Sequence, residues 1–376
     1  MFGDDDVAPL KASTDNTLQQ GSVEIRTDTE GYISITAGRV LGGRYKVLGE
    51  IGKGVFSAVL RCVDIQTNAE VVIKVARLNE LMKRAGRKEV EYLKLLTKKD
   101  PENKYCTLHM LDSFEDQDFL CIVLELLDIS LRETVYLYGQ GEGLSLTAVR
   151  YYGKRVLMGL YHMKQCGLVH TDLKLDNLLI DKSRKVLKVA DFGSTCRISE
   201  FVKGRVVELC PLWYRPPEVI VGFPYLSYSL DIWCLGNILF ELATGTVLFE
   251  GNSPAQQLRL YTEMLGPLPK KMVREPAAAS YFANGDPTKY LDVKVDPVTG
   301  RNIVSVVDMT HQPTVSLKER IFDFFAEAST EEKKQVENLF HVIESCLTLN
   351  PRKRISIEEC LKHPFFTADE AEKKKP

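Results

Sequence analysis

The pattern of hydrophobic and polar positions changes roughly a third of the way along the chain. Before residue 125, short apolar runs of strand length are separated by polar or glycine-rich segments, as at 45–51, 58–63, 71–73 and 120–124. After residue 130, apolar residues recur at helical spacing, as at 130–138, 146–166 and 339–347. We therefore expect a strand-rich part and a helix-rich part. Their join at 125–130 is a candidate ligand site.

One helix is expected within the strand-rich part, over 84–96. Its apolar residues share one face: Val90, Leu93 and Leu96. Glu89 lies one turn before Leu93 and is expected to point inward, whereas Glu91 is expected to face solvent. Lys74 ends an apolar strand, where an unpaired charge would be costly. It either extends its ammonium group to water or pairs with Glu89.

A glycine-bearing hairpin joins the first two strands. Gly52 and Gly54 lie at its tip, and Ser57 stands where a third glycine often follows. Glycine lets backbone amides come close to phosphate oxygens. Hairpins of this kind are common, so the motif is weak by itself.

The segment 170–177 carries the strongest chemical signal. Asp172, Lys174 and Asn177 stand at offsets 0, +2 and +5, and Asp191 follows at +19 at the start of Asp-Phe-Gly. An acid, a lysine, an amide and a second acid at these positions can place a hydroxyl against a metal-bound phosphate. Each acid taken alone could equally be a surface carboxylate or a helix cap.

Composition excludes several classes of protein. The 376 residues carry a formal net charge of -2, which gives no reason to expect direct binding to nucleic acid or a membrane. The nine cysteines include no C-x-x-C pair, which argues against zinc and disulfide frameworks. The longest apolar stretch, 230–249, contains Asp231, Asn237 and Glu241 and predicts a buried helix. Residues 1–43 are expected to be a mostly disordered extension with a docking segment at 31–41, and 367–376 a charged tail.

In this order and spacing, the motifs resemble the eukaryotic protein kinases over 44–366. The resemblance implies an α+β bilobal fold, with a β-rich N-lobe at 44–125 and a mainly helical C-lobe at 129–366. Tyr214-Arg215 and the stretch 265–269 are typical of the CMGC group and its insert. Thr171, where most kinases have arginine, is similar to the CDC-like branch.

Four stretches resemble the spliceosomal pre-mRNA-processing kinase family more closely: 52–57, 79–83, 88–93 and 130–133. This resemblance implies a serine/threonine kinase, related to dual-specificity kinases that also autophosphorylate tyrosine. Its protein substrates would be Arg/Ser-rich or spliceosomal, and its location the nucleus, with the cytoplasm as a second location. The Arg/Ser-rich arm usual in that family does not occur in this sequence, which leaves targeting open. Oligomeric state cannot be read from the sequence.

The same resemblance assigns the binding of ATP. The adenine would lie between apolar walls formed by Ile51, Val59, Val72, Leu124 and Leu179. Backbone groups of Glu125 and Leu127 would bond its edge, and Gly52 and Gly54 would cover the phosphates. Val72 replaces the alanine usual at its position, which makes the roof of the pocket bulkier.

The resemblance also assigns the chemistry. Lys74, steered by Glu89, would contact the α- and β-phosphates. Asn177 and Asp191 would hold Mg²⁺, which prefers carboxylate and amide oxygens. Asp172 would accept or orient the proton of the substrate hydroxyl, and Lys174 would neutralise charge on the transferred group.

Departures from the family lie before Glu218. Glu208 stands where relatives carry a phosphorylatable tyrosine, Pro211 where a hydroxyl residue is usual, and Leu212 where many have arginine. One hypothesis is that Glu208 takes part of the role of the phosphate, and the alternative is that it is merely solvated. Pro211 is expected to lower turnover.

Structural roles are expected for three charged residues. Asp231 would bond the backbone of the catalytic loop, residues 170–177, and Glu218 would form a buried ion pair with Arg354. Two further functions remain open at this point. One is a pseudokinase or scaffold with weak turnover, and the other is a proline-directed cell-cycle or signalling kinase of the same group.

Overall fold

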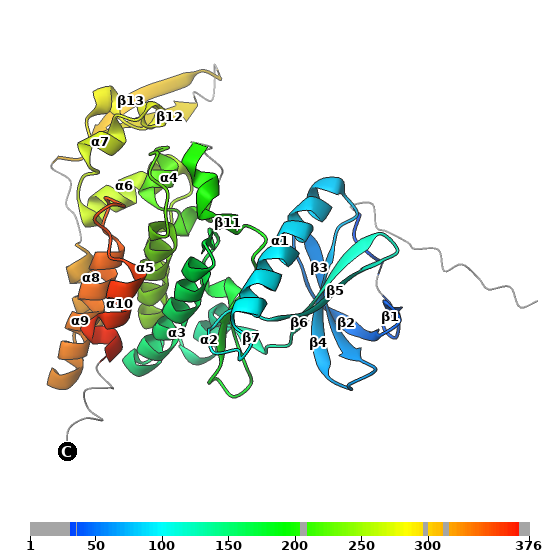
Figure 1. The fold of residues 1–376 in the computed structure, drawn as a ribbon. Helices are drawn as coiled ribbons and strands as arrows, with labels where there is room; N and C mark the ends of the chain where they lie inside the picture. Colours follow the sequence, from blue (N-terminus) through cyan, green and yellow to red (C-terminus); the bar gives the residue numbers. More distant parts are fainter. Residues whose placement is uncertain (1–30, 35, 204–208, 296–299, 311–315, 368–376) are drawn as a thin grey trace, which may run out of the picture.

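The computed structural model describes residues 31–34, 36–203, 209–295, 300–310 and 316–367. The expected disorder of residues 1–30, the hypothesis on Glu208 and most of the expected charged tail lie outside these residues. Figure 1 shows two lobes, one built on a sheet and one built of helices, with the chain passing between them after strand β6 (Phe119–Glu125). This arrangement confirms the predicted α+β bilobal fold.

The N-lobe is a six-stranded antiparallel sheet. Its strand order is β1-β2-β3-β4-β6-β5. The strands are β1 (Val40–Leu41), β2 (Tyr45–Lys53), β3 (Ser57–Asp64), β4 (Glu70–Ala76), β5 (Met110–Asp116) and β6 (Phe119–Glu125). Strands β2 and β3 are joined by a hairpin at residues 53–57. Its glycines, Gly52 and Gly54, line a cleft together with residues of the other lobe.

Helix α1 (Glu80–Lys99) packs against this sheet and is longer than the predicted 84–96. The Asn79 side chain accepts a hydrogen bond from Leu81 N at 2.8 Å, so it caps the helix four residues earlier. The predicted inward face is confirmed, because Val90, Leu93 and Leu96 are buried.

The C-lobe is mainly helical. Its helices are α2 (Leu131–Tyr138), α3 (Leu146–Gln165), α4 (Pro217–Ile220), α5 (Ser229–Thr244), α6 (Pro254–Leu265), α7 (Lys270–Val273), α8 (Leu317–Phe324), α9 (Thr330–Cys346) and α10 (Ile357–Lys362). Helix α5 is buried along nearly its whole length, as its apolar sequence predicts. It ends at Gly245, which has a left-handed backbone with φ of 73°. Within the described residues, no helix is long and apolar enough to cross a membrane.

The C-lobe also contains short strands and 3-10 helices. They are β7 (Ile129–Ser130), β8 (Leu168–Val169), η1 (Leu175–Asn177), β9 (Leu178–Ile180), β10 (Leu187–Val189), β11 (Cys196–Arg197), η2 (Ile198–Lys203) and η3 (Leu212–Tyr214). Strand β11 pairs with β8, which fixes the chain after Phe192 beside the start of the catalytic loop.

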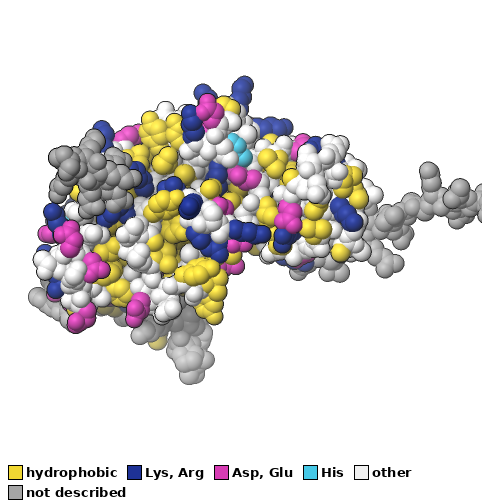
Figure 2. All heavy atoms as spheres, turned by 90° about the horizontal axis from the view of Figure 1, so that it is seen from below, with side chains coloured by type: hydrophobic (Ala, Val, Ile, Leu, Met, Phe, Trp, Pro, Cys, Tyr) yellow, Lys and Arg dark blue, Asp and Glu magenta, His cyan; other side chains and the backbone are white. Residues whose placement is uncertain are grey.

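The segment between α7 and α8 forms a separate projection. It contains η4 (Pro276–Ser280), η5 (Ala283–Gly285) and the antiparallel hairpin of β12 (Lys289–Val295) and β13 (Asn302–Asp308). Figure 1 shows it at the end of the C-lobe far from the N-lobe. Figure 2 shows charged side chains of both signs interspersed with hydrophobic ones on the face it draws.

Candidate active site

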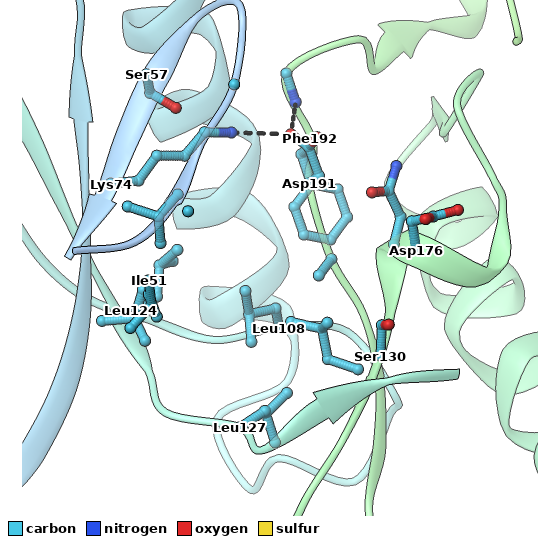
Figure 3. Close-up of a pocket in the computed structure, with 18 of the residues that line it drawn as sticks. Ile51, Ser57, Lys74, Leu108, Leu124, Leu127, Ser130, Asp176, Asp191 and Phe192 are labelled. Atoms are coloured by element: carbon cyan, nitrogen blue, oxygen red, sulfur yellow. Dashed lines mark hydrogen bonds and ion pairs between the residues drawn. The ribbon is translucent and has the colours of Figure 1, made fainter. Parts of the chain in front are cut away.

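A cleft of about 870 Å³ lies between the two lobes. Every residue that the sequence assigned to nucleotide, metal or catalysis lines it: Ile51, Gly52, Gly54, Val59, Val72, Lys74, Glu89, Leu124, Glu125, Leu127, Asp172, Lys174, Asn177, Leu179 and Asp191. Apolar side chains gather at one end and charged ones at the other, as Figure 3 shows for Leu124 and Leu127 against Lys74 and Asp191. Such a cleft suits a ligand with a flat apolar part and an anionic part.

Lys74 bridges the lobes. Its Nζ lies 2.8 Å from Glu89 Oε1 and 2.8 Å from Asp191 Oδ1, the second contact being drawn in Figure 3. The first contact confirms the predicted pairing with Glu89. Burial tends to lower the pKa of Lys74, but the two carboxylates outweigh it and hold the pKa above its usual value. Lys74 is therefore a fixed positive charge at the anionic end of the cleft.

Asp191 reaches the cleft through an unusual backbone conformation. Its φ is 62°, in the left-handed region that is strained for a non-glycine residue. The following Phe192 is buried, with its ring centroid 5.8 Å from that of His170. Burial tends to raise the pKa of Asp191, but the charge of Lys74 outweighs it and the pKa lies below its usual value. The side chain is thus an anion that faces the cleft.

In the catalytic loop, two of the predicted residues, Lys174 and Asn177, contact the carboxylate of a third, Asp172. Lys174 Nζ lies 3.0 Å from Asp172 Oδ2, and Asn177 Nδ2 donates to the same oxygen at 2.9 Å. Asn177 Nδ2 also donates to the Asp172 carbonyl at 2.8 Å. The amide nitrogen is used in these bonds, so the amide oxygen is the atom that can accept a cation.

Asp231 on α5 binds the backbone at the start of this loop. Its two carboxylate oxygens accept hydrogen bonds from His170 N at 2.8 Å and Thr171 N at 3.0 Å. This confirms the structural role predicted for Asp231. Burial raises the pKa of its carboxyl, against the effect of these bonds.

Comparison with known proteins decides the family. The protein kinase domain matches residues 45–366. The chain belongs to the protein kinase family. It is 36% identical over 340 residues to serine/threonine-protein kinase prp4 of Schizosaccharomyces pombe, covering 90% of this chain and 70% of that protein.

Further relatives place the kinase within its group. It is 33% identical over 345 residues to serine/threonine-protein kinase prpf4B of Dictyostelium discoideum, covering 90% of this chain and 41% of that protein. It is 29% identical over 371 residues to dual specificity protein kinase CLK2 of Homo sapiens, covering 93% and 69%. These matches confirm the predicted resemblance to the CMGC-group splicing-factor kinases. The chain is a serine/threonine protein kinase that uses ATP and a divalent metal, and the pseudokinase alternative finds no support.

The contacts between α1 and the segment after Asp191 were not predicted from the sequence. Glu200 Oε2 lies 2.8 Å from Lys88 Nζ, and Glu200 Oε1 accepts a hydrogen bond from the Tyr92 hydroxyl at 3.1 Å. Arg197 pairs with Glu91, whose side chain is 61% exposed, in agreement with its predicted outward position. These contacts hold the helix that carries Glu89.

A second unpredicted cluster lies below the catalytic loop of the kinase. Arg132 on α2 pairs with the buried Glu241 of α5 and donates to the Tyr214 hydroxyl at 2.8 Å. The Tyr214 hydroxyl in turn donates to Glu241. Burial raises the pKa of Glu241, and the bonds from Tyr214 and Arg132 oppose this rise. Sequence spacing could not find this cluster, because its members lie up to 109 positions apart.

Cys210 gives the loop before Glu218 an unusual shape. Its φ is 65°, and its carbonyl accepts hydrogen bonds from Arg215 Nε at 3.0 Å and Nη2 at 2.9 Å. Its amide donates to the Thr171 carbonyl at 2.8 Å, which ties this loop to the catalytic loop. Pro211 follows directly, so this position carries no side-chain hydroxyl.

The predicted ion pair beneath this loop is confirmed. Arg354 Nη1 and Nη2 donate to the two carboxylate oxygens of Glu218 at 2.6 and 2.9 Å. Both side chains are fully buried. A bidentate pair of this kind fixes α4 against the chain before α10.

Proposed function

We propose that this kinase transfers the γ-phosphoryl group of ATP to serine and threonine hydroxyls of splicing proteins, with Asp172 as the residue that takes the proton. The observation that carries the proposal is the convergence of Lys74, Asp191 and the Asp172–Asn177 cluster in one cleft. These residues come from both lobes and from sequence positions more than 100 residues apart. Their convergence supports a site for a nucleotide and a hydroxyl together.

The apolar end of the cleft would hold the adenine. Ile51, Val59 and Val72 would cover one face of the base, and Leu124 and Leu179 would complete its surroundings. The backbone of Glu125 and Leu127 would bond its polar edge. Gly52 and Gly54 would place backbone amides over the phosphates, where a side chain would interfere with close approach.

The anionic end of the cleft fits Mg²⁺. Asp191 offers a carboxylate and Asn177 an amide oxygen, both of which are ligands that this cation prefers. Among the residues described, no group of three or more His, Cys, Asp and Glu side chains could hold a metal alone. This is compatible with a site in which phosphate oxygens supply the remaining ligands. When bound, the metal would neutralise phosphate charge.

The roles in transfer follow from charge and position. Lys74 would hold the α- and β-phosphates, with Glu89 keeping its ammonium group in place. The bonds that Lys174 and Asn177 make to the Asp172 carboxylate both go to Oδ2, so Oδ1 would accept the proton of the substrate hydroxyl. Lys174 would then offset negative charge that develops on the transferred group.

The substrate class follows from resemblance. The similarity to prp4 and prpf4B supports spliceosomal or Arg/Ser-rich protein substrates and a nuclear role for this kinase. Residues 45–366 carry the kinase match, so the proposal concerns this domain.

The backbone at Cys210 favours a second substrate specificity, for proline after the acceptor serine. Because Arg215 already occupies the Cys210 carbonyl, this carbonyl cannot accept a hydrogen bond from a substrate amide. An amide buried there without a partner would cost about 1–3 kcal/mol. Proline has no amide hydrogen, so a substrate with proline after the acceptor serine would avoid this cost. A proline-directed kinase is therefore the alternative proposal.

One experiment tests both proposals. The purified chain would be given labelled ATP, Mg²⁺ and three matched peptides. One contains Arg/Ser repeats, one a Ser-Pro unit and one a Ser-Ala unit. Transfer to Arg/Ser peptides that is lost in Asp172→Asn supports the splicing proposal. A preference for Ser-Pro over Ser-Ala that weakens in Arg215→Lys supports the alternative. If Asp172→Asn retains the wild-type rate, the role proposed for Asp172 is wrong.

A further inference from the structure

The segment 31–33 lies against the glycine hairpin, outside the residues that line the cleft. Tyr32 is 7% exposed, and its hydroxyl donates a hydrogen bond to the Gly54 carbonyl at 2.7 Å. Gly54 lines the cleft whereas Tyr32 does not. The Gly54 carbonyl is therefore bonded to a residue that is not part of the cleft lining.

This segment is anchored at both of its ends. Leu78 N donates to the Gly31 carbonyl at 2.8 Å, which joins it to the connection between β4 and α1. Ile33 is 5% exposed and packs in the core of the N-lobe sheet with Leu41 and Tyr45. Tyr32 is thus held by its neighbours in a fixed position beside the hairpin.

The side chains at the tip of the hairpin are exposed. Val55 and Phe56 are 66% and 51% exposed. Arg77 holds the Val55 carbonyl through Nη1 at 2.9 Å, and its amide donates to the Phe56 carbonyl at 3.0 Å. Arg77 also lies over the Tyr32 ring, 4.6 Å from its centroid.

A second cation contacts the same ring. Lys53 Nζ lies 4.0 Å from the centroid of Tyr32, within the range of a cation–π contact. Lys53 ends β2, the first strand of the hairpin, and Arg77 follows β4, which pairs with its second strand β3. The Tyr32 ring therefore contacts cations from both sides of the hairpin. The ring and the hydroxyl of Tyr32 therefore act on the same short stretch of chain.

We propose that Tyr32 is a positioning residue for the nucleotide, holding the Gly54 peptide so that its carbonyl points away from the phosphates. A carbonyl oxygen turned toward the phosphates would repel them, and a glycine peptide can rotate easily because it has no side chain. The Tyr32 hydroxyl removes this alternative by bonding the oxygen on the outer side. The proposal rests on the proposed binding of phosphates beneath Gly52 and Gly54.

The decisive variant is Tyr32→Phe, which keeps the ring and its cation contacts and removes the hydroxyl. We expect the Kd for a non-hydrolysable ATP analogue and the KM for ATP to rise roughly three- to tenfold, as for loss of one hydrogen bond. The kcat at saturating ATP is expected to stay within about twofold, because Asp172 and Asp191 are untouched. Hydrogen exchange at residues 54–56 is expected to become faster.

The matched control is Tyr136→Phe, because Tyr136 is a tyrosine on α2 that is 83% exposed. It is expected to leave the KM and the exchange rates unchanged. A Tyr32→Phe protein with a lower Tm and an unchanged KM would overturn the proposal, since Tyr32 would then serve stability alone. Tyr32→Ala provides a second measurement and is expected to raise the KM further.

Binding of the ATP analogue distinguishes failure of the proposed nucleotide site from failure of the role proposed for Tyr32. If the wild-type chain does not bind the ATP analogue, or if Lys74→Met leaves binding unchanged, the proposed nucleotide site is wrong. If the wild-type chain binds and Tyr32→Phe binds equally well with the same exchange at Gly54, only the role of Tyr32 is wrong.

Discussion

Lys88 and Glu200 lie 2.8 Å apart and join helix α1 to the segment that follows Asp191. The same carboxylate accepts a bond from Tyr92, one turn further along the helix. Glu89 lies between these two residues in sequence and bonds Lys74. The position of Glu89 therefore depends on a contact made by the segment after Asp191, with no phosphate among the atoms involved.

Glu200→Ala is expected to lower kcat/KM about two- to fivefold. The Lys88 and Glu200 side chains are each 41% exposed, so their pair is worth roughly 0.2–1 kcal/mol. Steady-state kinetics with a fixed peptide would measure the change. Glu70→Ala is the control, because Glu70 forms a similarly exposed pair with Arg61 on β3 and β4. An equal loss in both variants would show that the effect is not specific to α1.

The kinase is expected to keep its activity after phosphatase treatment, within about twofold. The Thr171 hydroxyl donates to the Ser194 carbonyl at 2.6 Å, so this position ties the catalytic loop to the segment after Asp191 through a neutral bond. A guanidinium that would need a phosphate partner does not occur there. Bacterially expressed protein, assayed before and after treatment, is the measurement. Loss of activity on dephosphorylation would refute the expectation.

The role of Glu208 is tested in the same kinetic assay, on the phosphatase-treated protein. If its carboxylate replaces a phosphate, Glu208→Gln lowers kcat/KM although the protein carries no phosphate. If Glu208 is merely solvated, Glu208→Gln and wild type have the same rate. Glu331→Gln is a suitable control, since Glu331 is an exposed carboxylate in the first turn of α9.

The sequence predicted contacts of charged residues that lie in apolar strands or helices, where burying an unpaired charge costs free energy. Lys74 was expected to end its strand, but β4 continues to Ala76. An unpaired charge in this apolar strand would still be costly, and Glu89 was the carboxylate on the inward face of the next helix. Asp231 was an acid in an apolar helix, where a carboxylate needs donors, and it has two backbone amides. A buried charge is a strong signal because leaving it unpaired is expensive.

Other contacts between segments far apart in the sequence could not be predicted in this way. Glu200 is an ordinary surface carboxylate in the sequence, and its partners lie more than 100 positions away. Tyr32 lies in the expected docking segment 31–41, but no periodicity relates it to Gly54. Such contacts depend on how the lobes and this segment pack, and local pattern carries no information on that.

The buried pair of Glu218 and Arg354 is expected to be the most costly ion pair to break. Both side chains are fully buried, so Glu218→Ala leaves an unpaired guanidinium and is expected to lower the free energy of unfolding by about 3–5 kcal/mol. Denaturant unfolding would measure it. Glu115→Ala breaks the exposed pair with Arg87 and is expected to change stability by less than about 1 kcal/mol. A similar loss in both would contradict the argument from burial.

The pair of Lys164 and Glu358 gives stability a defined pH dependence. Lys164 Nζ donates to both oxygens of Glu358, at 2.6 and 2.7 Å, and these bonds lower the pKa of the carboxyl below its ordinary 4.5. A carboxyl with a lowered pKa stabilises the fold above its unfolded pKa and loses that contribution as pH falls through its folded pKa. The unfolding free energies of wild type and Glu358→Gln should therefore differ by a constant amount, below about 1 kcal/mol, from about pH 8 to pH 6. The difference should shrink below the ordinary value of 4.5, and a difference that stays constant there would mean that the charge of Glu358 is not its source.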